Sequence, residues 1–526
     1  MRTAPQLTTW GRSLKADDLT EEHMNLARLV DEHLAEHGDH ESIYFEGKWY
    51  STGESHARIR AIAAGLRSLG VEPGDRVAVL LPNCIEVGLI YWATWRIGAA
   101  ATPIIFLLPP PEVKRILSDS EAKVLITSPE LLLTSQVAAD GVDTLKQIVC
   151  IDPPEGENVM AFEDLEKHGE ADIADRAPDD LAALLYTGGT TGASKGVMLS
   201  HNNLEWTART AAEAAEIEPD EVSLSALPLS HSFGLHVSIA GSLLRSKGIL
   251  MRWFDPNGML DLIEEFGVQR MAVVPTMLQM LLATGIEGRD LSSLTSITSG
   301  AAGLPNEVLR AWEEKVPNCP LVQGYGLSET SPTVSVQRAS SARDGTRAIG
   351  SVGKVIDGCS VRIADEDDKE LPTGEVGEIT IKGPNVMLGY WRNTEATAEA
   401  IKNGWFHSGD MGNLDADGNL YIVERKKDLI IRGGFNVYPK DVEGVLLEHP
   451  AVGEAAVVGR DSAKFGEEPV AFIVPKAGAE VSEEDLLAYG EEKLAKYKRP
   501  VEVRIVTEIP KTPVGKIDKK VLRTQL

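Results

Sequence analysis

The strongest chemical signal in the sequence is the run YTGGTTGASKG over residues 186–196, which follows an apolar stretch expected to form a strand. Glycines let the backbone approach a ligand closely and point its N–H groups inward, a geometry that binds anions. The polar side chains of this run are Thr187, Thr190, Thr191 and Lys195. Hydroxyl donors and a cation on a glycine-rich loop predict a cradle for phosphate groups.

The run differs from the Walker A phosphate loop, in which glycine stands directly before the lysine and serine or threonine follows it. Here Ser194 precedes Lys195 and Gly196 follows it. A glycine-rich turn without a ligand is therefore the alternative interpretation of this segment taken alone.

A second candidate is the run YGLSET over residues 325–330, directly after a predicted strand at 321–323. In open α/β sheets, loops beyond the carboxyl ends of the strands form the usual ligand crevice. Glu329 could bind a Mg²⁺ ion that bridges phosphates, and Tyr325 could cover a nucleotide base. A helix cap formed by the serine and glutamate is the structural alternative.

Two further polar segments lie toward the C-terminus. Asp410 ends the run WFHSGD and could accept hydrogen bonds from ribose hydroxyls, and Arg425 is a second polar candidate. The run PKTPVGKIDK is a short basic loop in which proline and glycine fix a turn that presents Lys516. A lysine with the ordinary pKa of about 10.4 is cationic at neutral pH, and a cation stabilises the charge that builds on a transferring phosphoryl group. Singly, these residues could equally belong to surface turns, salt bridges or a basic tail.

The elements that must position these residues follow an α/β pattern up to about residue 326. Short apolar strands alternate with helical stretches, which predicts a domain with largely parallel, buried strands. The predicted strands are Arg76–Leu81, Lys123–Thr127, Ile148–Ile151, Leu181–Tyr186, Arg270–Pro275, Leu294–Thr298 and Leu321–Gln323, and the predicted helices are Glu21–His37, Asn203–Glu216, Pro256–Phe266 and Pro305–Lys315.

Beyond residue 350 the pattern changes to β-structure and then to a small α+β unit. Ser360–Ala364 and Glu378–Lys382 flank an acidic turn and predict an antiparallel pair. The charged cluster ERKKD at 424–428 precedes the last unit, with predicted strands Asp428–Arg432, Glu454–Val458, Val470–Val474 and Val503–Val506 and predicted helices Pro439–Glu448 and Glu483–Ala495. The fold class expected is α/β: a large N-terminal domain of mainly parallel sheets with helices, a β-rich subdomain, and a small C-terminal α+β domain.

Composition excludes several classes of function. Lys and Arg number 52 and Asp and Glu number 79, which gives a net charge of −27; this excess repels nucleic acids and anionic lipid surfaces. The four cysteines show no CxxC spacing, as expected of reduced thiols in a cytoplasmic protein. The N-terminus has no apolar signal core, and polar residues and prolines interrupt the apolar stretch 77–108, so no transmembrane segment is expected.

Taken together, the motifs resemble the acyl-adenylate-forming superfamily, which contains acyl-CoA synthetases, amino-acid adenylation domains and beetle luciferase. The resemblance covers nearly the whole chain, with several motifs in the family's order. They are the Gly/Thr loop, LPLSH at 227–231, YGLSET, Ser408–Asp410, Glu424–Arg425, GGFNVYP at 433–439 and Lys516. The resemblance implies an ATP-dependent acyl-CoA ligase that uses Mg²⁺ and coenzyme A.

The resemblance also implies a role for each matching residue. ATP would be bound by Thr187, Gly188, Gly189, Thr190, Thr191, Gly192, Lys195, Ala302, Gln323, Gly324, Tyr325, Gly326, Ser328, Asp410, Arg425 and Lys516, and the metal by Thr190 and Glu329. The catalytic residues would be Lys516, His231, Thr190 and Glu329. The acyl pocket would be formed by His231, Phe233, Val274, Gly300, Ala301, Gly326 and Leu327, and the CoA segment by Gly433, Gly434, Phe435 and Asn436.

The family's domain plan implies an N-terminal domain at 1–424, a hinge at 425–428 that contains Lys427, and a mobile C-terminal domain at 429–526. In the first half-reaction the carboxylate attacks the α-phosphorus of ATP and pyrophosphate leaves. The small domain then rotates, Lys516 moves out, and the Gly433–Asn436 face guides the thiol to the acyl-adenylate.

Some residues depart from the family's pattern. Gly188 replaces a frequent serine and Ser194 a frequent proline; since neither change removes the backbone cradle, altered affinity is expected rather than lost activity. Plant aryl-CoA ligases and luciferase carry lysines at the positions of Ile431 and Gly433. Their absence makes the chain look closer to bacterial fatty-acyl-CoA ligases.

The substrate expected is a fatty or aryl carboxylic acid. Amino-acid adenylation domains place an aspartate just after the LPLSH-type motif, but the run SHSFGLH at 230–236 has no acid, and an unpaired buried ammonium is costly. An acyl-AMP ligase that serves a carrier protein or another nucleophile is the alternative function. Intact Lys516, Glu329 and Asp410 argue against a catalytically silent relative, and the sequence leaves a homodimer open.

Overall fold

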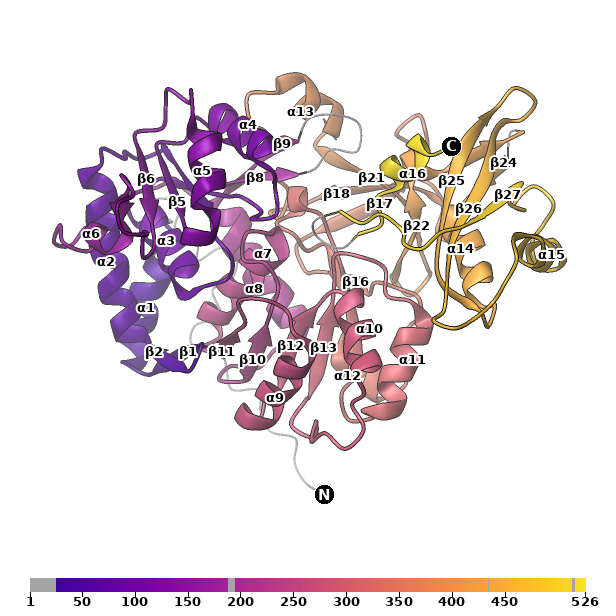
Figure 1. Cartoon of the computed structure of the whole chain (residues 1–526), viewed down its shortest axis with the longest axis horizontal. Coiled ribbons are helices and arrows are strands. Elements are labelled where there is room, and N and C mark those ends of the chain that lie inside the picture. The colour runs from indigo at the N-terminus through magenta and orange to yellow at the C-terminus, as the bar shows by residue number, and fades with distance from the viewer. Residues whose placement is uncertain (1–24, 188–193, 434, 513–515) are drawn as a thin grey trace.

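The computed structural model describes residues 25–187, 194–433, 435–512 and 516–526, and two helix-covered sheets make up most of it (Figure 1). The first sheet has the order β19–β9–β8–β4–β3–β5–β6–β7. Its strands are β3 (Arg76–Leu80), β4 (Ala100–Pro103), β5 (Val124–Thr127), β6 (Gln147–Cys150), β7 (Met160–Ala161), β8 (Leu181–Thr187), β9 (Lys195–Ser200) and β19 (Gly389–Tyr390). Strands β3 to β8 pair in parallel, whereas β9 pairs antiparallel with β8 and β19.

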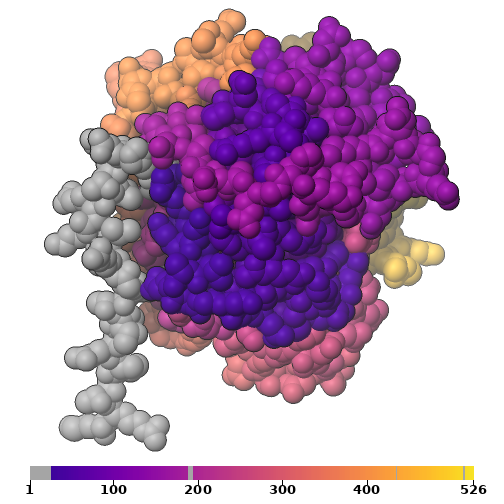
Figure 2. Space-filling view, turned by 90° about the vertical axis from the view of Figure 1, so that its left-hand side faces the viewer, coloured from indigo at the N-terminus to yellow at the C-terminus, as the bar shows by residue number. Residues whose placement is uncertain are grey.

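Each helix of this part is partly or almost wholly buried. All five residues of β3 are buried, as expected of a parallel strand covered on both faces. The associated helices are α2 (Thr52–Ser68), α3 (Ile85–Arg96), α4 (Pro110–Ser120), α5 (Leu132–Ala139) and α6 (Phe162–Leu165). The face of the molecule shown in Figure 2 is formed mainly by these N-terminal segments, with the C-terminal segment visible only at one edge.

The second sheet has the order β16–β15–β14–β13–β12–β10–β11–β1–β2. Its strands are β1 (Glu41–Phe45), β2 (Lys48–Ser51), β10 (Val222–Ser225), β11 (Lys247–Leu250), β12 (Arg270–Val273), β13 (Ser296–Ser299), β14 (Leu321–Tyr325), β15 (Ser335–Val336) and β16 (Lys354–Val355). The central strands β10 to β14 are parallel, so their carboxyl ends share one edge.

Two helices, α7 (His201–Ala214) and α8 (Ser232–Leu243), lie between the two sheets in Figure 1. Ser200 caps α7 by accepting a hydrogen bond from the backbone N–H of Asn203, whose side chain in turn accepts from Ser200 N–H. The remaining helices of this half are α1 (Arg28–His37), α9 (Pro256–Phe266), α10 (Pro275–Thr284), α11 (Asn306–Lys315) and α12 (Ala339–Arg343). A core around the fully buried Trp312 joins α9, α10 and α11 to the second sheet.

The β-rich part consists of β17 (Ser360–Ala364), β18 (Gly377–Lys382), β20 (Ile401–Lys402), β21 (Trp405–Leu414) and β22 (Leu420–Arg425), with α13 (Thr394–Ala400). All its pairings are antiparallel, as predicted for the first pair. A 3-10 turn, η4 (Lys426–Asp428), follows β22 directly.

The C-terminal part is a small α+β unit with its own core, at the end of the molecule opposite α2 and α6 in Figure 1. Its elements are β23 (Ile430–Arg432), β24 (Phe435–Val437), β25 (Val452–Ser462), β26 (Gly466–Pro475), β27 (Glu502–Ile505), α14 (Pro439–Leu447), α15 (Glu483–Lys493) and α16 (Lys519–Thr524). The α/β fold class and its three-part division are confirmed.

Some predicted boundaries are wrong. The strand expected to reach Pro275 ends at Val273, because Pro275 opens α10 at a position where its missing N–H is harmless. The first helix begins at Arg28, and residues 21–24 of its predicted range lie outside the described part. Across the described residues, no helix is both long and apolar enough to span a membrane.

Candidate active site

The carboxyl edge of the second sheet collects several of the predicted residues around one cavity of about 170 Å³. Because β13 and β14 are parallel neighbours, the turns after them bring Gly300, Ala301 and Leu327 to the same edge. His231 reaches this edge from the N-terminus of α8, and Lys516 reaches it from the C-terminal unit. Residues far apart in sequence therefore meet where ligands usually bind in open α/β sheets.

A buried carboxylate links the YGLSET turn to the β-rich part. Asp410 and Arg425 are register partners on β21 and β22, and Arg425 Nε lies 2.7 Å from Asp410 Oδ1. Tyr325 donates its hydroxyl to Asp410 Oδ2 at 2.7 Å. Burial, followed by the charge of Asp410, raises the pKa of Tyr325 well above its usual range, so the phenol stays a donor. The three side chains thus form one polar group beside the cavity.

Lys516 is part of the cavity lining, and its backbone is hydrogen-bonded to Thr512. Its backbone N–H donates to Thr512 Oγ1 at 3.2 Å, and Thr512 N–H donates to the carbonyl oxygen of Lys516 at 2.7 Å. Burial lowers the pKa of Lys516, and the positive charge of Arg425 lowers it further, while Asp410 and Glu329 act in the opposite direction. Lys516 is thus a largely desolvated amine within electrostatic range of two carboxylates and one guanidinium group.

His231 forms the N-cap of α8, where its Nδ1 accepts a hydrogen bond from Phe233 N–H at 3.2 Å. Burial and the neighbouring charge of Lys516 lower the pKa of His231 to about 4. The imidazole is therefore neutral at pH 7, and with Nδ1 accepting, the proton resides on Nε2.

Glu329 lies in the turn η3 (Ser328–Thr330), where Tyr390 of β19 donates its hydroxyl to Glu329 Oε1 at 3.0 Å. Lys195 Nζ lies 4.9 Å from the centre of the Tyr390 ring, a cation–π distance. Tyr390 therefore connects Lys195, at the end of the Gly/Thr loop, to Glu329 in η3. Sequence reasoning missed Tyr390, because it stands alone on a two-residue strand.

The Gly/Thr loop lies only partly within the described residues. Thr187 and Lys195 face each other as the last register pair of β8 and β9, so the loop closes an antiparallel hairpin. The predicted phosphate-binding residues Gly188, Gly189, Thr190, Thr191 and Gly192 lie outside the described residues.

Hydrogen bonds, strand pairing and close backbone packing fix the positions of the residues predicted to contact adenine. Gln323 is buried and accepts a hydrogen bond from Leu304 N–H at 3.3 Å, and Gly324 pairs with β15. A Cβ atom on Gly326 would collide with the carbonyl oxygen of Pro332, so the turn admits only glycine there. Ser328 donates to the hydroxyl of Ser232 at 3.1 Å. Ala302 is exposed beside this edge.

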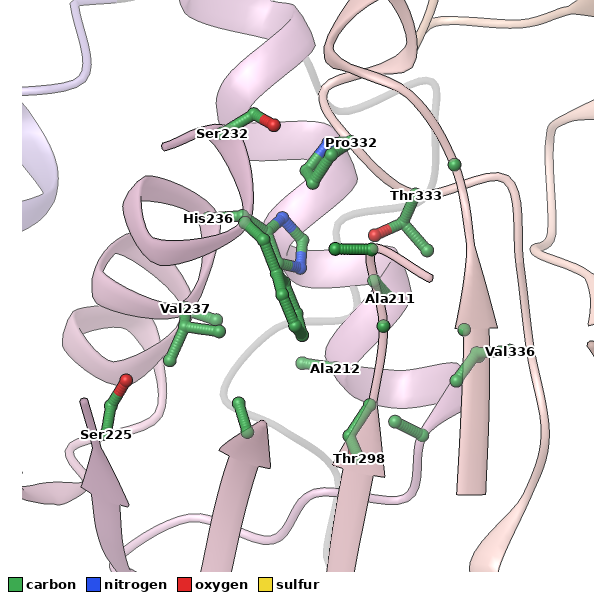
Figure 3. A pocket seen from close by; sticks show the side chains of 18 of the residues that line it. Ala211, Ala212, Ser225, Ser232, His236, Val237, Thr298, Pro332, Thr333 and Val336 are labelled. Atoms are coloured by element: carbon green, nitrogen blue, oxygen red, sulfur yellow. The ribbon is translucent and has the colours of Figure 1, made fainter. Parts of the chain in front are cut away.

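Most predicted acyl-pocket residues line the cavity: His231, Phe233, Gly300, Ala301, Gly326 and Leu327. Val274, the N-cap of α10, is absent from the described residues that form the lining. The cavity continues between α7, α8 and the sheet, along residues that the sequence did not single out (Figure 3). They include Ala211, Ala212, His236, Val237, Thr298, Pro332, Thr333 and Val336.

The predicted CoA residues lie on the C-terminal unit. Gly433 has a left-handed backbone (φ 60°), and its N–H donates to the carbonyl oxygen of Phe465 at 2.6 Å. Phe435 is 60% exposed and stacks on Tyr497 with ring centres 5.0 Å apart. Asn436 is also exposed, and Gly434 lies outside the described residues. In Figure 1, β24 lies at the outer end of this unit, so this segment is not brought to the cavity.

Lys427, the predicted hinge residue, lies in η4 between the two parts of the chain. Burial and the charge of Arg425 lower its pKa. The adjacent Asp428 forms a 2.6 Å ion pair with Arg523 of α16. Within the described ranges, no group of three or more His, Cys, Asp or Glu side chains is arranged to hold a metal ion.

Comparison with known proteins decides the family. The sequence profile of the AMP-binding enzyme family matches residues 30–391, and that of the AMP-binding enzyme C-terminal domain matches residues 441–516. The chain belongs to the AMP-binding enzyme family. The large N-terminal match spans both helix-covered sheets, and the C-terminal match ends at Lys516.

Relatives of this AMP-binding enzyme include CoA ligases of aromatic acids. A feruloyl-CoA synthase of an Amycolatopsis species is 38% identical over 480 residues, covering 89% of this chain and 92% of that protein. The ATP-bound structure of MatB from Rhodopseudomonas palustris matches with a TM-score of 0.88 at 34% identity, covering 95% and 98% of the two chains. The anthranilate CoA ligase AuaEII in complex with anthranoyl-AMP matches with a TM-score of 0.90 at 28% identity, covering 97% and 99%.

Proposed function

We propose that this AMP-binding enzyme is an ATP-dependent acyl-CoA ligase that activates an aryl or other apolar carboxylic acid as its adenylate. One observation carries the proposal: Lys516 from the C-terminal unit lines a largely apolar cavity together with His231, within electrostatic range of the Asp410–Arg425 pair. The apolar pocket can hold the tail of an acid, and the neutral imidazole can orient its carboxylate. The positively charged side chains can stabilise the charge that builds when this carboxylate attacks a phosphorus atom.

In the proposed first half-reaction, the tail of the acid occupies the cavity and its carboxylate lies between His231 and Lys516. The Nε2–H of His231 is available to orient one carboxylate oxygen, because Nδ1 is committed to the helix cap. Lys516 stabilises the charge that develops on the α-phosphate as the carboxylate attacks and pyrophosphate leaves. The carboxylate of Asp410, which Tyr325 and Arg425 hold in place, accepts hydrogen bonds from the ribose hydroxyls.

The residues present also fit a magnesium ion. Mg²⁺ usually retains waters and is bound through one or two carboxylates together with substrate phosphates, so a multi-carboxylate cage is not required. Glu329, oriented by Tyr390, would supply that carboxylate, and Thr190 a hydroxyl. The bound ion would neutralise charge on the leaving pyrophosphate.

In the proposed second half-reaction, CoA thiolysis of the adenylate gives the acyl-CoA and AMP. The exposed Phe435, which stacks on the half-buried Tyr497 near Gly433, offers an aromatic surface for the adenine of CoA. Because this segment lies away from the cavity, the C-terminal unit (429–526) must rotate about residues 425–428 between the half-reactions.

The test is product identification by mass spectrometry with ATP, Mg²⁺, CoA and a panel of aryl and aliphatic acids. An acyl-CoA product is expected, with aryl acids among the best substrates. Acyl-AMP without acyl-CoA would instead support an acyl-AMP ligase that serves another nucleophile. Absence of both products from every acid would overturn the proposal.

A further inference from the structure

The last strand before the hinge directs two neighbouring side chains to different parts of the molecule. On β22, Arg425 pairs with Asp410 beside the cavity, whereas Glu424 contacts the C-terminal unit, since successive residues of a strand point to opposite faces. The side chain of Glu424 is only 3% exposed, and β22 lies beside α14 of that unit (Figure 1). A buried carboxylate requires partners that compensate for its lost hydration.

Two of the partners of Glu424 belong to the C-terminal unit. Its Oε2 accepts a hydrogen bond from the backbone N–H of Lys440 at 3.1 Å and lies 3.7 Å from Lys519 Nζ. Lys440 is in the first turn of α14, where N–H groups have no partner within the helix. Among the described residues, the N-cap residue Tyr438 makes no side-chain capping bond to this helix. The carboxylate of Glu424 therefore supplies the negative charge that a helix N-terminus favours.

The lysine partner is shared with a second carboxylate. Lys519 Nζ lies 2.9 Å from Oε1 of Glu443, which also accepts a hydrogen bond from Val457 N–H at 2.8 Å. Although burial lowers the pKa of Lys519, the charges of Glu443 and Glu424 raise it above its ordinary value, so the ammonium group stays charged. Glu443, Val457 and Lys519 all belong to the C-terminal unit and keep their bonds when it moves as a body. The bonds of Glu424 to this unit are lost in such a movement.

We infer that Glu424 is a positioning residue that holds the C-terminal unit in its docked arrangement, in which Lys516 lines the cavity. Lys516 lies three residues before Lys519 in the chain, so the contact that places Lys519 also places Lys516. A contact made in one of two arrangements shifts the balance toward that arrangement. The inference rests on the proposed ligase function, because it concerns the rotation between the two half-reactions.

The balance between the arrangements can be measured without any substrate. Spin labels at Glu307→Cys on α11 and Glu484→Cys on α15, both exposed, report the distance between the two parts by pulsed electron paramagnetic resonance; Cys359→Ser removes the one described cysteine that is not buried. With Glu424 present, the main population should have the distance of the docked arrangement. Glu424→Ala should raise the ratio of undocked to docked molecules about tenfold or more, the effect of losing hydrogen bonds to a charged group.

The two half-reactions should respond differently. With the best acid of the panel, single-turnover rates are measured for adenylation and, separately, for acyl transfer from supplied acyl-adenylate. Glu424→Ala should lower the ratio of the first rate to the second about tenfold, because only adenylation uses the docked arrangement. Glu424→Gln keeps an oxygen for Lys440 N–H but offers no charge to Lys519, so its ratio should lie between those of the wild type and Glu424→Ala.

Two control variants remove other carboxylates of the same helix. Glu448, at the opposite end of α14, pairs with Lys493 inside the C-terminal unit at 2.7 Å, so Glu448→Ala should change neither the distance distribution nor the ratio of rates. Glu443→Gln retains an acceptor for Val457 N–H and leaves Lys519 to Glu424 alone. The docked population should therefore not fall in this variant.

The outcomes separate the two proposals. An unchanged docked population in Glu424→Ala, or an equal fall in both rates, would overturn the role of Glu424 and leave the ligase function intact. If the docked population responds to Glu424 but no acid of the panel gives acyl-AMP or acyl-CoA, the ligase function is overturned and the docking contact remains.

Discussion

Lys516 interacts electrostatically with residues from several different elements of the site. The charge of Lys516 lowers the pKa of His231, and the charges of Arg425, Asp410 and Glu329 act on the pKa of Lys516, so one side chain from the C-terminal unit interacts electrostatically with four residues of the site. Its neighbour Lys511, by contrast, pairs with Glu454 on the surface at 2.9 Å. Two lysines five residues apart therefore have different expected functions.

Replacing Lys516 with alanine should lower the rate of adenylation by at least about a hundredfold, the usual effect of removing one preorganised charge from a transition state. ATP binding should change little, and thioester formation from supplied acyl-adenylate should persist. Single-turnover measurements of each half-reaction check this. Lys511→Ala should leave both half-reactions unchanged; failure of both in Lys516→Ala would contradict the role.

The lowered pKa of Lys516 predicts a pH dependence. The lysine must be protonated to stabilise negative charge, and its protonated fraction falls as pH rises through its pKa. Because burial and Arg425 lower this pKa, adenylation should decline at a pH below the ordinary lysine range. The half-reaction that starts from supplied adenylate should lack this alkaline decline. An identical decline in both half-reactions would assign it to another group.

Motif residues were predictable from the sequence because the chemistry confines them to short runs. The turn with Glu329, the strand end with Asp410 and the loop with Lys516 each carry glycine or proline beside a polar residue. Tyr390 and His236 carry no such signal, since each is one polar residue in an otherwise ordinary strand or helix. Their positions beside Glu329 and in the cavity lining depend on what other elements place opposite them, which is information that only the fold contains.

At the scale of elements, the parallel strands were predictable because burial on both faces makes them short continuous apolar runs, as in β3 and β5. The antiparallel pairing of β8 with β9 was not predictable, because nothing in the glycine-rich run between them indicates that the chain reverses its direction. The helix α8 was also missed, since its sequence, SFGLHVSIAGSL, is apolar on most sides and lacks a clear amphipathic period.

The turn after β14 depends on Gly326. Gly326→Ala should destabilise the protein by about 1–3 kcal/mol or more and abolish adenylation, because its Cβ would overlap backbone atoms of Pro332, which cannot move like a flexible side chain. Gly303→Ala is the matched control at the same edge, since nothing lies within 4 Å of a Cβ there. Thermal denaturation should show a lower Tm for the first variant only; equal Tm values would contradict the packing argument.

At the scale of the whole molecule, η4 connects two units with separate cores. Lys427→Pro fixes φ near −65°, which a 3-10 turn accepts, so the present arrangement should survive while rotation about this bond is blocked. Adenylation should then remain, and acyl transfer to CoA should fall at least about tenfold. Lys427→Ala shortens the side chain but still allows rotation about the N–Cα bond of residue 427, so this variant should retain both half-reactions. Equal acyl transfer in both variants would place the hinge elsewhere.

The position of Lys516 in the cavity lining has a consequence for the order of events. In the proposed mechanism, the side chain that supplies the positive charge is also part of the cavity wall. If the C-terminal unit rotates as proposed, the acid can exchange with solvent only while Lys516 is withdrawn, and it can be activated only while Lys516 is in place. The proposed rotation would then also keep the acyl-adenylate away from bulk water until the C-terminal unit moves.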